Sequence, residues 1–302
     1  MPVELGLSLP QFGPFAGDAA RIGRFAADAE AAGAASLWVG DRLLAARRPT
    51  VGYLGRDTIP ETFRRALDPF AVLAAAAVTT TTATLGTSVL VAPLYAPAVL
   101  ARSLATIAGL ADGRLVAGLG IGWSPEEYAA AGVGFDHRGA RLDELLDHLE
   151  VLWSGRDETP EGRFWATPAA YVETPSPRVP LWASAFSDAA LRRVGRRCDG
   201  WLPSAWIRDP AVETARAVAE RLAGLRPVID AAALEAGRDP AAIPTVLRVN
   251  FAAGVGRDEL AEAVTLLVEQ TGFRRVFLDP VYRDATLEDW LGSFTHLRDA
   301  LA

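Results

Sequence analysis

The sequence predicts an α/β fold, a single eight-stranded parallel β/α barrel of the TIM type with two insertions at its rim. Short β-rich segments alternate with longer helical patterns along all 302 residues, and strands separated by helices pair in parallel. Eight such units close into a barrel, and a single barrel commonly reaches this length. Half of the residues are hydrophobic and 22% are charged, so the chain can fill a large core. The alternation also fits an open doubly wound sheet, which the count alone does not exclude.

Eight segments have the composition of strands, because they are short, apolar and rich in β-branched residues. The segment 84–91 is continuously apolar rather than alternating, which is typical of a parallel strand buried on both faces. The predicted strands are Val3–Leu9, Ser36–Gly40, Thr84–Val91, Leu115–Leu119, Leu181–Ser184, Gly200–Pro203, Val246–Ala252 and Arg275–Leu278.

The segments between these strands carry helical patterns with start and stop signals. Asp68 precedes Pro69, the order of an N-cap followed by a proline in the first turn. Ser124 and Glu127 have the spacing of a capping box, and Gly33 ends the first helix. The predicted helices are Asp18–Ala32, Asp68–Val78, Ala98–Leu110, a helix from Ser124, Arg138–Trp153, Ser187–Arg197, a helix opened by Asp209-Pro210, a short helix or turn at Asp239-Pro240, Asp258–Thr271 and Leu287–Leu301.

Two longer stretches interrupt the alternation, Leu43–Leu67 and Ser154–Pro180. We expect both to emerge as loops or small excursions over one rim of the barrel, where binding residues usually lie. No segment has the composition of a linker between domains. We therefore expect one domain over residues 1–302.

The charge balance argues against a nucleic-acid surface, because 30 Lys and Arg residues face 37 Asp and Glu residues, a net charge of −7. Cys198 is the only cysteine, which excludes an internal disulfide framework and a cysteine-rich metal site. The most apolar window, 70–91, is broken by four threonines and by Gly86, so no membrane span is predicted. The N-terminus carries no targeting signal, and we expect a cytoplasmic protein.

The sequence lacks the patterns of several common catalytic sites. The stretch 118–123 (GLGIGW) resembles a dinucleotide-binding loop, but its third glycine falls one residue early and Trp123 takes its place. His137, His148 and His296 are not spaced with carboxylates as metal ligands are. We expect these histidines on the surface and no metal site, and a hydrolase or metalloenzyme is disfavoured.

The carboxyl ends of the predicted strands carry unusual residues, and in a barrel these ends all point to one face. Aromatic side chains are accompanied there by small polar ones, which suits an extended aromatic ring better than a small sugar phosphate. The residues are Gln11, Asp41, Arg42, Ser88, Trp123, Ser184, Phe186, Ser187, Trp201, Ser204 and Trp206. In the alternative interpretation the tryptophans only pack loops onto the rim.

Ser187 stands at the start of the predicted helix 188–197. Free amide groups at a helix N-terminus bind anions, and the hydroxyls of Ser184 and Ser187 could help them to hold a phosphate group. A capping serine without a ligand fits the sequence equally well, and the carboxylate of Asp188 would repel an anion. Both interpretations stay open at this point.

Seven short motifs follow one another along the chain. They are LWVGD (37–41), LGTSVL (85–90), the helix 100–110 followed by DGRL (112–115), GIGW (120–123), RGARLDE (138–144), CDGWLP (198–203) and AGRDP (236–240). In this order and spacing, and nearly from end to end of the chain, the set resembles the bacterial luciferase-like flavin and deazaflavin oxidoreductases.

This resemblance implies an eight-stranded barrel whose C-terminal face binds FMN or coenzyme F-420 in extended form. It implies a cis peptide bond between Ser88 and Val89 that supports the ring from behind. It also implies a phosphate-binding loop formed by Ser184, Ala185, Phe186 and Ser187, and we add Trp123 and Ser204 to the expected cofactor-binding residues. Members of the family often dimerise, which leaves a homodimer open.

The chain departs from the family near the expected ring. Many deazaflavin-dependent members have a histidine where Arg42 follows Asp41. An arginine stays charged, so it can stabilise an anionic ring or substrate but is a poor proton shuttle. Ala96 stands where relatives often have another histidine, and Trp123 replaces the acidic residue of relatives that oxidise sugar phosphates. A neutral, apolar or aromatic substrate is therefore favoured.

The preferred hypothesis is an oxidoreductase that transfers a hydride between coenzyme F-420 and a neutral or aromatic small-molecule substrate. Asp41 and Arg42 are the expected catalytic residues, and Gln11 and Trp206 are expected to line the substrate pocket. One alternative is an FMN-dependent monooxygenase that uses oxygen and receives reduced flavin from a separate reductase. A second alternative is a flavin-binding relative that has lost activity.

Overall fold

The computed structural model describes the chain except residues 1–2, 171, 173–177, 209–210, 283–285 and 302. The strands form one sheet, and every pair of neighbours in it is parallel. The strands are β1 Glu4–Ser8, β2 Ser36–Val39, β3 Thr84–Thr87, β4 Leu90–Val91, β5 Leu115–Gly120, β6 Leu181–Ala183, β7 Gly200–Trp201, β8 Ser204–Ile207, β9 Val246–Phe251 and β10 Arg275–Asp279. The predicted parallel α/β fold is confirmed.

The sheet runs in the order β7-β6-β5-β3-β2-β1-β10-β9-β8, with β4 paired to β5. β7 and β8 stand at opposite ends of this path, although they are consecutive in the chain. The N–H of Trp201 in β7 donates to the carbonyl of Pro244 just before β9, at 2.9 Å, and the N–H of Arg248 in β9 donates to the carbonyl of Pro203 at 2.9 Å. The sheet therefore curls until its two ends approach each other beside β9.

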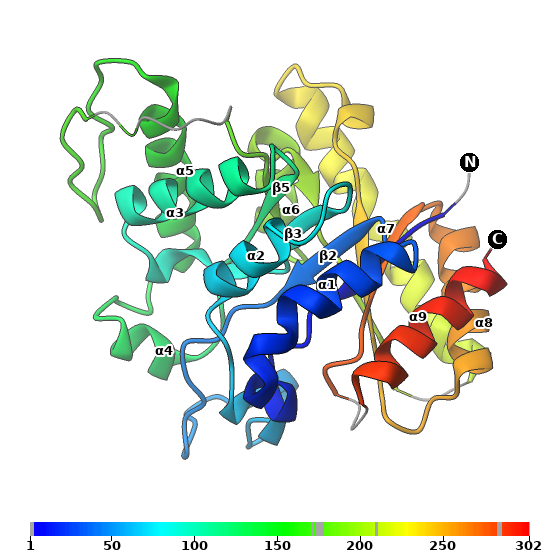
Figure 1. Ribbon diagram of the computed structural model, residues 1–302. Helices are drawn as coiled ribbons and strands as arrows, with labels where there is room; N and C mark the ends of the chain where they lie inside the picture. The colour runs from blue at the N-terminus through cyan, green and yellow to red at the C-terminus, as the bar shows by residue number, and fades with distance from the viewer. Residues whose placement is uncertain (1–2, 171, 173–177, 209–210, 283–285, 302) are drawn as a thin grey trace.

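Helices cover the outer side of the curled sheet (Figure 1). The α-helices are α1 Ile22–Ala31, α2 Pro69–Ala77, α3 Pro97–Leu110, α4 Pro125–Ala130, α5 Arg138–Ser154, α6 Asp188–Arg197, α7 Val212–Glu235, α8 Arg257–Thr271 and α9 Leu287–Ala300. Short 3-10 segments are Gly13–Arg21, Tyr53–Gly55, Glu61–Arg64, Ala92–Leu94 and Pro240–Ala242. Because β1 pairs with β10 and contacts α9, the two ends of the chain lie near each other (Figure 1).

The helix signals in the sequence are partly confirmed. The Asp68 side chain caps α2 by accepting a hydrogen bond from the N–H of Ala71 at 2.9 Å. The predicted helix 18–32 is shorter as an α-helix, because 3-10 geometry with a non-helical Asp18 precedes Ile22. The predicted start at residues 209–210 lies outside the described residues, and α7 begins at Val212.

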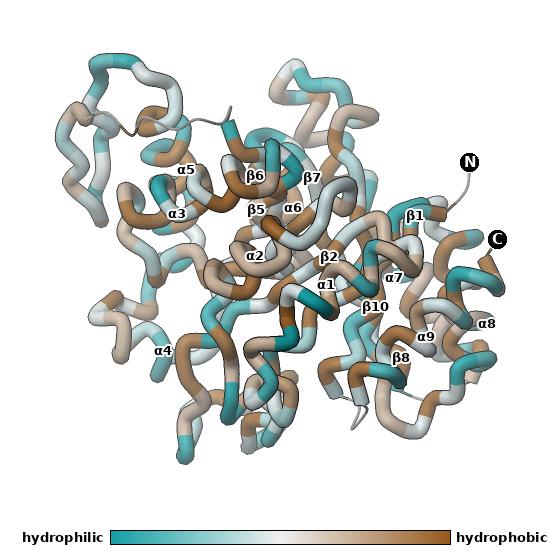
Figure 2. The backbone as a smooth tube through the Cα atoms, in the orientation of Figure 1, coloured by the Kyte–Doolittle hydropathy of each residue, from teal (hydrophilic) through white to brown (hydrophobic). Residues whose placement is uncertain are grey.

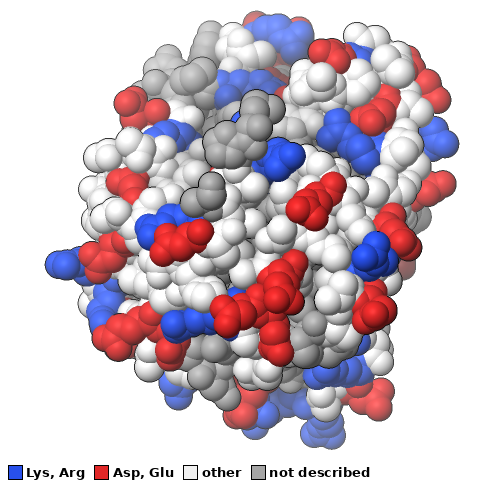
Figure 3. All heavy atoms as spheres, turned by 90° about the vertical axis from the view of Figure 1, so that its right-hand side faces the viewer, with Lys and Arg blue, Asp and Glu red and all other residues white. Residues whose placement is uncertain are grey.

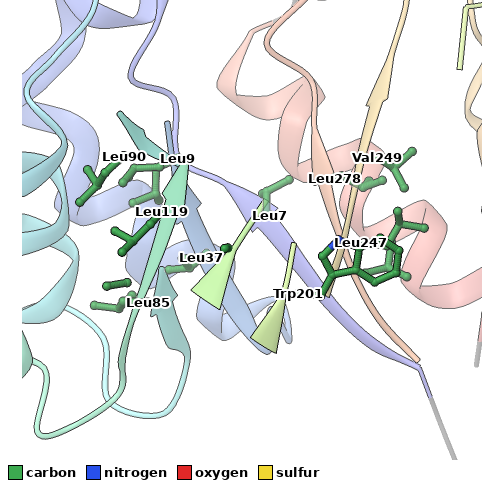
Figure 4. Packing of buried hydrophobic residues seen from close by; sticks show 14 of the residues in the cluster. Leu7, Leu9, Leu37, Leu85, Leu90, Leu119, Trp201, Leu247, Val249 and Leu278 are labelled. Carbon is green, nitrogen blue, oxygen red and sulfur yellow. The ribbon is translucent and has the colours of Figure 1, made fainter. Parts of the chain in front are cut away.

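The convex side of the sheet packs against the helices through a large apolar cluster. Leu7 of β1, Leu37 of β2 and Leu85 of β3 are fully buried there (Figure 4). Along most of the helices, hydrophobic residues alternate with hydrophilic ones (Figure 2), which is the pattern of helices that bury one face.

A second cluster of large side chains fills the concave side of the sheet. Trp38 of β2 stacks on Phe277 of β10 with ring centroids 4.9 Å apart, and it lies 6.4 Å from the ring of Trp182 in β6. These three strands are not neighbours in the sheet, so their side chains meet across the interior. We call this cluster, completed by Val116, Leu202 and Val246, the aromatic floor.

Gly86 of β3 leaves the space that Trp38 occupies, because a Cβ at Gly86 would lie 2.3 Å from an atom of the Trp38 ring. We expect Gly86→Ala to lower the free energy of unfolding by about 1–3 kcal/mol through overpacking, measured by urea denaturation. Gly224→Ala in α7 is the matched control, since a Cβ there meets no atom within 4 Å and alanine favours a helix. Equal effects of the two substitutions would contradict this packing.

The third predicted strand is interrupted. β3 ends at Thr87 and β4 begins at Leu90, and the peptide bond between Ser88 and Val89 is cis, as the resemblance implied. The Thr87 hydroxyl bonds to both the N–H and the carbonyl of Gly118 in β5, at 2.8 and 2.7 Å. The sixth predicted strand, Gly200–Pro203, is present as the shorter β7, and the next strand, β8, begins at Ser204, just beyond the predicted end.

Both predicted insertions are present as irregular segments. Residues 43–67 contain only the two short 3-10 segments, and the described part of 155–180 contains no helix or strand. The carboxylate of Glu144 in α5 accepts hydrogen bonds of 2.8 Å from the N–H groups of Arg163, Phe164 and Trp165. These bonds fasten the second insertion to α5.

Within the described ranges, no helix is both long and apolar enough to span a bilayer. On the face that Figure 3 presents, acidic and basic side chains are interspersed. Such mixing is typical of a solvated protein surface.

Candidate functional site

Two cavities adjoin each other at the carboxyl ends of the strands. The first, which we call the inner cavity, has a volume of about 190 Å³. Its lining residues are Phe12, Gly40, Asp41, Arg42, Tyr53, Phe63, Ser88, Val89, Val91, Gly122, Trp123 and Arg248. Val89 also packs on the aromatic floor, so the floor supports one wall of the inner cavity.

Asp41 follows β2 and ties the interrupted third strand to it. Its Oδ2 accepts hydrogen bonds from the N–H of Val91 at 2.8 Å and from the hydroxyl of Tyr95 at 2.9 Å. Burial raises the pKa of the Asp41 carboxyl to about 6, against the opposing effect of these two bonds. Its Oδ1 has no hydrogen-bond donor among the described residues, and Asp41 lines the inner cavity.

The guanidinium of Arg42 is buried between two aromatic rings, 4.9 Å from the centroid of Phe63 and 4.6 Å from that of Trp123. Its Nη2 donates to Glu127 of α4 at 3.2 Å. The other Glu127 oxygen accepts from the N–H groups of the two residues that follow Arg42, at 2.8 and 3.3 Å. Within the described part of the chain, Nη1 of Arg42 is buried without a partner.

Arg248 of β9 reaches the inner cavity from the other side. Its Nη1 donates to the carbonyl of Ser88 at 3.0 Å, and its Nη2 forms an ion pair with Asp279 at the end of β10. Asp279 also accepts a hydrogen bond of 2.9 Å from the Ser8 hydroxyl. The Nε of Arg248 is buried and makes no hydrogen bond to the described residues.

Sequence analysis did not single out Arg248. The available signal was the alternation of polar and apolar residues in β9, where Arg248 and Asn250 interrupt an otherwise apolar strand. In a strand, alternate side chains point to opposite faces, so a charged residue within β9 indicated a polar feature inside the curled sheet.

The second cavity, which we call the outer cavity, has a volume of about 540 Å³ and shares Tyr53 and Arg248 with the inner one. Its lining residues are Tyr53, Leu54, Phe186, Ser204, Trp206, Arg208, Thr214, Val218, Arg221, Leu222, Arg248 and Asn250. Among the described residues, this lining contains three arginines and no carboxylate, so the outer cavity suits an anionic group. The guanidinium of Arg221 lies 5.6 Å from the centroid of the Phe186 ring.

An aromatic cover lies over the boundary between the cavities. Tyr53, from the first insertion, contacts Phe63 at 5.1 Å and Trp123 at 5.4 Å between ring centroids. The Tyr53 hydroxyl is hydrogen-bonded to that of Tyr282, which packs 4.2 Å from the ring of Trp206. Sequence reasoning placed the insertion at this rim but did not identify Tyr53 or Tyr282, because no local pattern marks their contacts.

The structure distributes the predicted site residues over both cavities. Asp41, Arg42, Ser88, Val89 and Trp123 meet in the inner cavity, and Phe186, Ser204 and Trp206 meet in the outer one.

The remaining predicted residues have structural contacts instead. The Gln11 amide bonds to the backbone of Gly40, at 2.6 and 3.0 Å, and of Leu67 at 3.2 Å. Ser184, Ala185 and Ser187 line neither cavity. The Ser187 side chain makes no capping hydrogen bond at the start of α6.

The prediction that all three histidines lie on the surface is wrong for His148. This side chain is fully buried, and its Nδ1 lies 2.8 Å from the hydroxyl of Thr167 in the second insertion. Burial also lowers its pKa. In the described ranges, no group of three or more His, Cys, Asp or Glu side chains could hold a metal ion.

Comparison with known protein families gives a match over nearly the whole chain. A model of the luciferase-like monooxygenase family matches residues 5–301. An uncharacterized protein of Mycobacterium tuberculosis is 31% identical over 165 residues, which is 52% of this chain and 56% of that protein. An F-420-dependent glucose-6-phosphate dehydrogenase of Intrasporangium calvum is 35% identical over 143 residues, 44% of this chain and 43% of that enzyme. The matches thus span about half the length of these relatives.

Solved structures resemble the fold at low sequence identity. An F-420-dependent secondary alcohol dehydrogenase, in complex with an F-420–acetone adduct, aligns over 100% of both chains with a TM-score of 0.74 and 18% identity. The oxygenating constituent of 3,6-diketocamphane monooxygenase from Pseudomonas putida, in complex with FMN, aligns with a TM-score of 0.74 and 16% identity, over 100% of this chain and 98% of that one. At such identities the likeness establishes the fold alone.

Proposed function

Because this chain belongs to the luciferase-like monooxygenase family, an enzyme family with oxidoreductase and monooxygenase members, we propose that it transfers a hydride between coenzyme F-420 and a neutral or aromatic organic substrate. The observation that carries this proposal is the pair of adjoining cavities. The inner one is lined by Arg42 and Arg248, each of which carries a buried N–H without a partner among the described residues, and the outer one is lined by arginines.

The size of the two cavities fits an extended cofactor. Ligand sites usually measure about 300–1,000 Å³, so the inner cavity of about 190 Å³ holds a ring system but not a nucleotide-like molecule. A ring placed there can continue past Tyr53 and Arg248 into the outer cavity. Arg208 and Arg221 would then bind the phosphate of the tail.

The polar atoms of the inner cavity fit the same group. One edge of the flavin and deazaflavin rings resembles uracil and presents two carbonyl acceptors that flank one N–H donor. The residues that line the inner cavity carry two donors without partners among the described residues, on Arg42 and Arg248, and one acceptor, Oδ1 of Asp41. Donor and acceptor numbers therefore match this edge of the ring.

The bound cofactor would supply the hydride chemistry, and the chain's own residues bind, orient and exclude water. Arg42 carries a permanent charge and does not shuttle protons. The Asp41 carboxyl has a pKa near 6, so at neutral pH it is mostly ionised and its Oδ1 would accept a hydrogen bond from the ring. Tyr53, which lines both cavities, and its hydrogen-bond partner Tyr282 would shield them from water.

We also propose that the curled sheet is a closed eight-stranded barrel within one domain of residues 1–302. In this interpretation β3 and β4 are one strand interrupted at the cis peptide bond, and β7 and β8 are another. The contacts of Trp201 and Arg248 beside β9 support closure. A homodimer stays a prediction.

Titration of the purified protein with each cofactor, followed by visible absorption, tests the proposal. We expect coenzyme F-420 to bind with a spectral shift. FMN binding without any binding of F-420 would instead support the FMN-dependent monooxygenase. That alternative needs a separate reductase, and the FMN-bound structural relative favours it. Binding without turnover of any substrate would support an inactive relative.

The arginines of the outer cavity are expected to determine how tightly the cofactor tail binds. We expect Arg221→Gln to weaken cofactor binding by about 10-fold to 100-fold, because a hydrogen bond between charged groups contributes about 1.5–3 kcal/mol. The matched control is Arg216→Gln on the same helix, since Arg216 is exposed and outside the cavity lining. Equal affinities of the two variants, measured by titration calorimetry, would place the tail elsewhere.

A further inference from the structure

We infer that Arg42 and Arg248 bind the cofactor ring more tightly in its reduced form than in its oxidised form, and thereby raise its reduction potential. This inference rests on the proposed function, because it takes the ring to occupy the inner cavity. It assigns these two residues, one at the end of β2 and one within β9, to the tuning of the cofactor.

The first step of this inference rests on two buried N–H groups that have no hydrogen-bond partner among the described residues. The side chain of Arg42 is only 5% exposed, yet its Nη1 makes no hydrogen bond in the described part of the protein, and the same holds for Nε of Arg248. A buried donor without an acceptor costs about 1–3 kcal/mol. Both donors belong to residues that line one small cavity, so a ligand that carries acceptor atoms there would remove this cost.

The second step of the inference rests on where the charges of the two arginine–carboxylate pairs lie. The carboxylates that pair with the arginines bind their Nη2 atoms, and neither Glu127 nor Asp279 lines the inner cavity. The guanidinium groups therefore lie closer to a bound ring than their counterions do. In a buried site the field of the nearer charge is weakly screened.

The chemistry of hydride transfer carries the third step. A hydride brings one proton and two electrons, so the ring that accepts it gains one negative charge. Nearby guanidinium N–H groups stabilise this added charge. The carboxylate of Asp41 opposes the effect when it is ionised, but a neighbouring negative charge favours its protonated form.

The wild-type protein provides the first test. The dissociation constants of oxidised and reduced coenzyme F-420, and of oxidised and reduced FMN, are measured without oxygen. For the cofactor that binds, we expect the reduced form to bind at least 10-fold more tightly, equivalent to a potential about 30 mV above that of the free cofactor. Equal affinities, or tighter binding of the oxidised form, would overturn the inference. Failure of both cofactors to bind in either form would refute the proposed function instead.

Two conservative variants assign the effect to the arginines. Arg42→Lys and Arg248→Lys each replace the delocalised guanidinium charge by a compact ammonium charge, which stays beside the partner carboxylate, and remove the unpartnered guanidinium N–H that would face the ring. We expect each to reduce the preference for the reduced form by about 10-fold, with a smaller change in affinity for the oxidised form. Arg64→Lys in the first insertion is the control, because Arg64 is exposed and outside the inner cavity.

One result would refute the role that we assign to the two arginines. If both folded lysine variants keep the wild-type ratio of affinities, the arginines do not tune the ring and the inference fails. Circular dichroism establishes whether each variant is folded. A variant that does not fold leaves the other variant and the wild-type ratio as the deciding measurements.

Discussion

Replacement of Glu127 by alanine is expected to lower the free energy of unfolding by about 3–5 kcal/mol, the usual cost of leaving one partner of a buried ion pair alone. The substitution leaves the guanidinium of Arg42 buried without its counterion. It also removes the acceptor for two backbone N–H groups at the start of the first insertion. Urea denaturation followed by circular dichroism measures the loss.

Two further variants separate the ion pair from a general effect on α4. Glu126→Ala removes a carboxylate that accepts a 2.6 Å hydrogen bond from the N–H of Thr50, and this more exposed contact should contribute only about 1 kcal/mol. The double variant Arg42→Met with Glu127→Leu removes both charges and should recover most of the loss. A double variant as unstable as Glu127→Ala would show that the buried charge is not the cause.

Asp41→Asn is expected to stabilise the protein at neutral pH by up to about 3 kcal/mol. Burial raises the pKa of the Asp41 carboxyl in the folded protein from its ordinary value of 3.8 to about 6. Each unit of this difference corresponds to about 1.4 kcal/mol. Asparagine keeps an oxygen that can accept the bonds from Val91 and Tyr95 but carries no charge to bury.

The sign of the pH dependence follows from proton linkage. Between about pH 4 and 6 the folded protein holds a proton on Asp41 that the unfolded chain releases, so ionisation of Asp41 lowers stability as the pH rises through this range. The advantage of Asp41→Asn should therefore be small near pH 4 and reach its full size near pH 7. Asp28→Asn in α1 is a control, because Asp28 pairs with an exposed arginine. An advantage of Asp41→Asn that did not change with pH would contradict this account.

Local sequence signals predicted the secondary structure well where the interactions themselves are local. The cap at Asp68 and the turn at Asp239, where Pro240–Ala242 forms a 3-10 segment, lie where the sequence placed them. The capping box from Ser124 is only half formed. Its backbone bond to Glu127 is present at 3.4 Å, but the Glu127 carboxylate binds Arg42 instead, 85 residues away in the chain. No local spacing could reveal that competing partner.

The candidate site was predicted where strand ends alone determine it. Asp41, Arg42 and Trp123 follow their strands directly, and parallel strands bring them to one cavity. Arg248 and Tyr53 escaped prediction for different reasons. The first lies within a strand rather than after it, and the second belongs to an irregular insertion whose position depends on tertiary contacts.

The aromatic floor of Trp38, Trp182 and Phe277 has a consequence for kinetics. Val89, which lines the inner cavity, packs on these rings. If the cofactor ring occupies that cavity as we propose, it would have to enter before a substrate that lies nearer Tyr53. Initial-rate kinetics should then show a compulsory order of addition, cofactor before substrate.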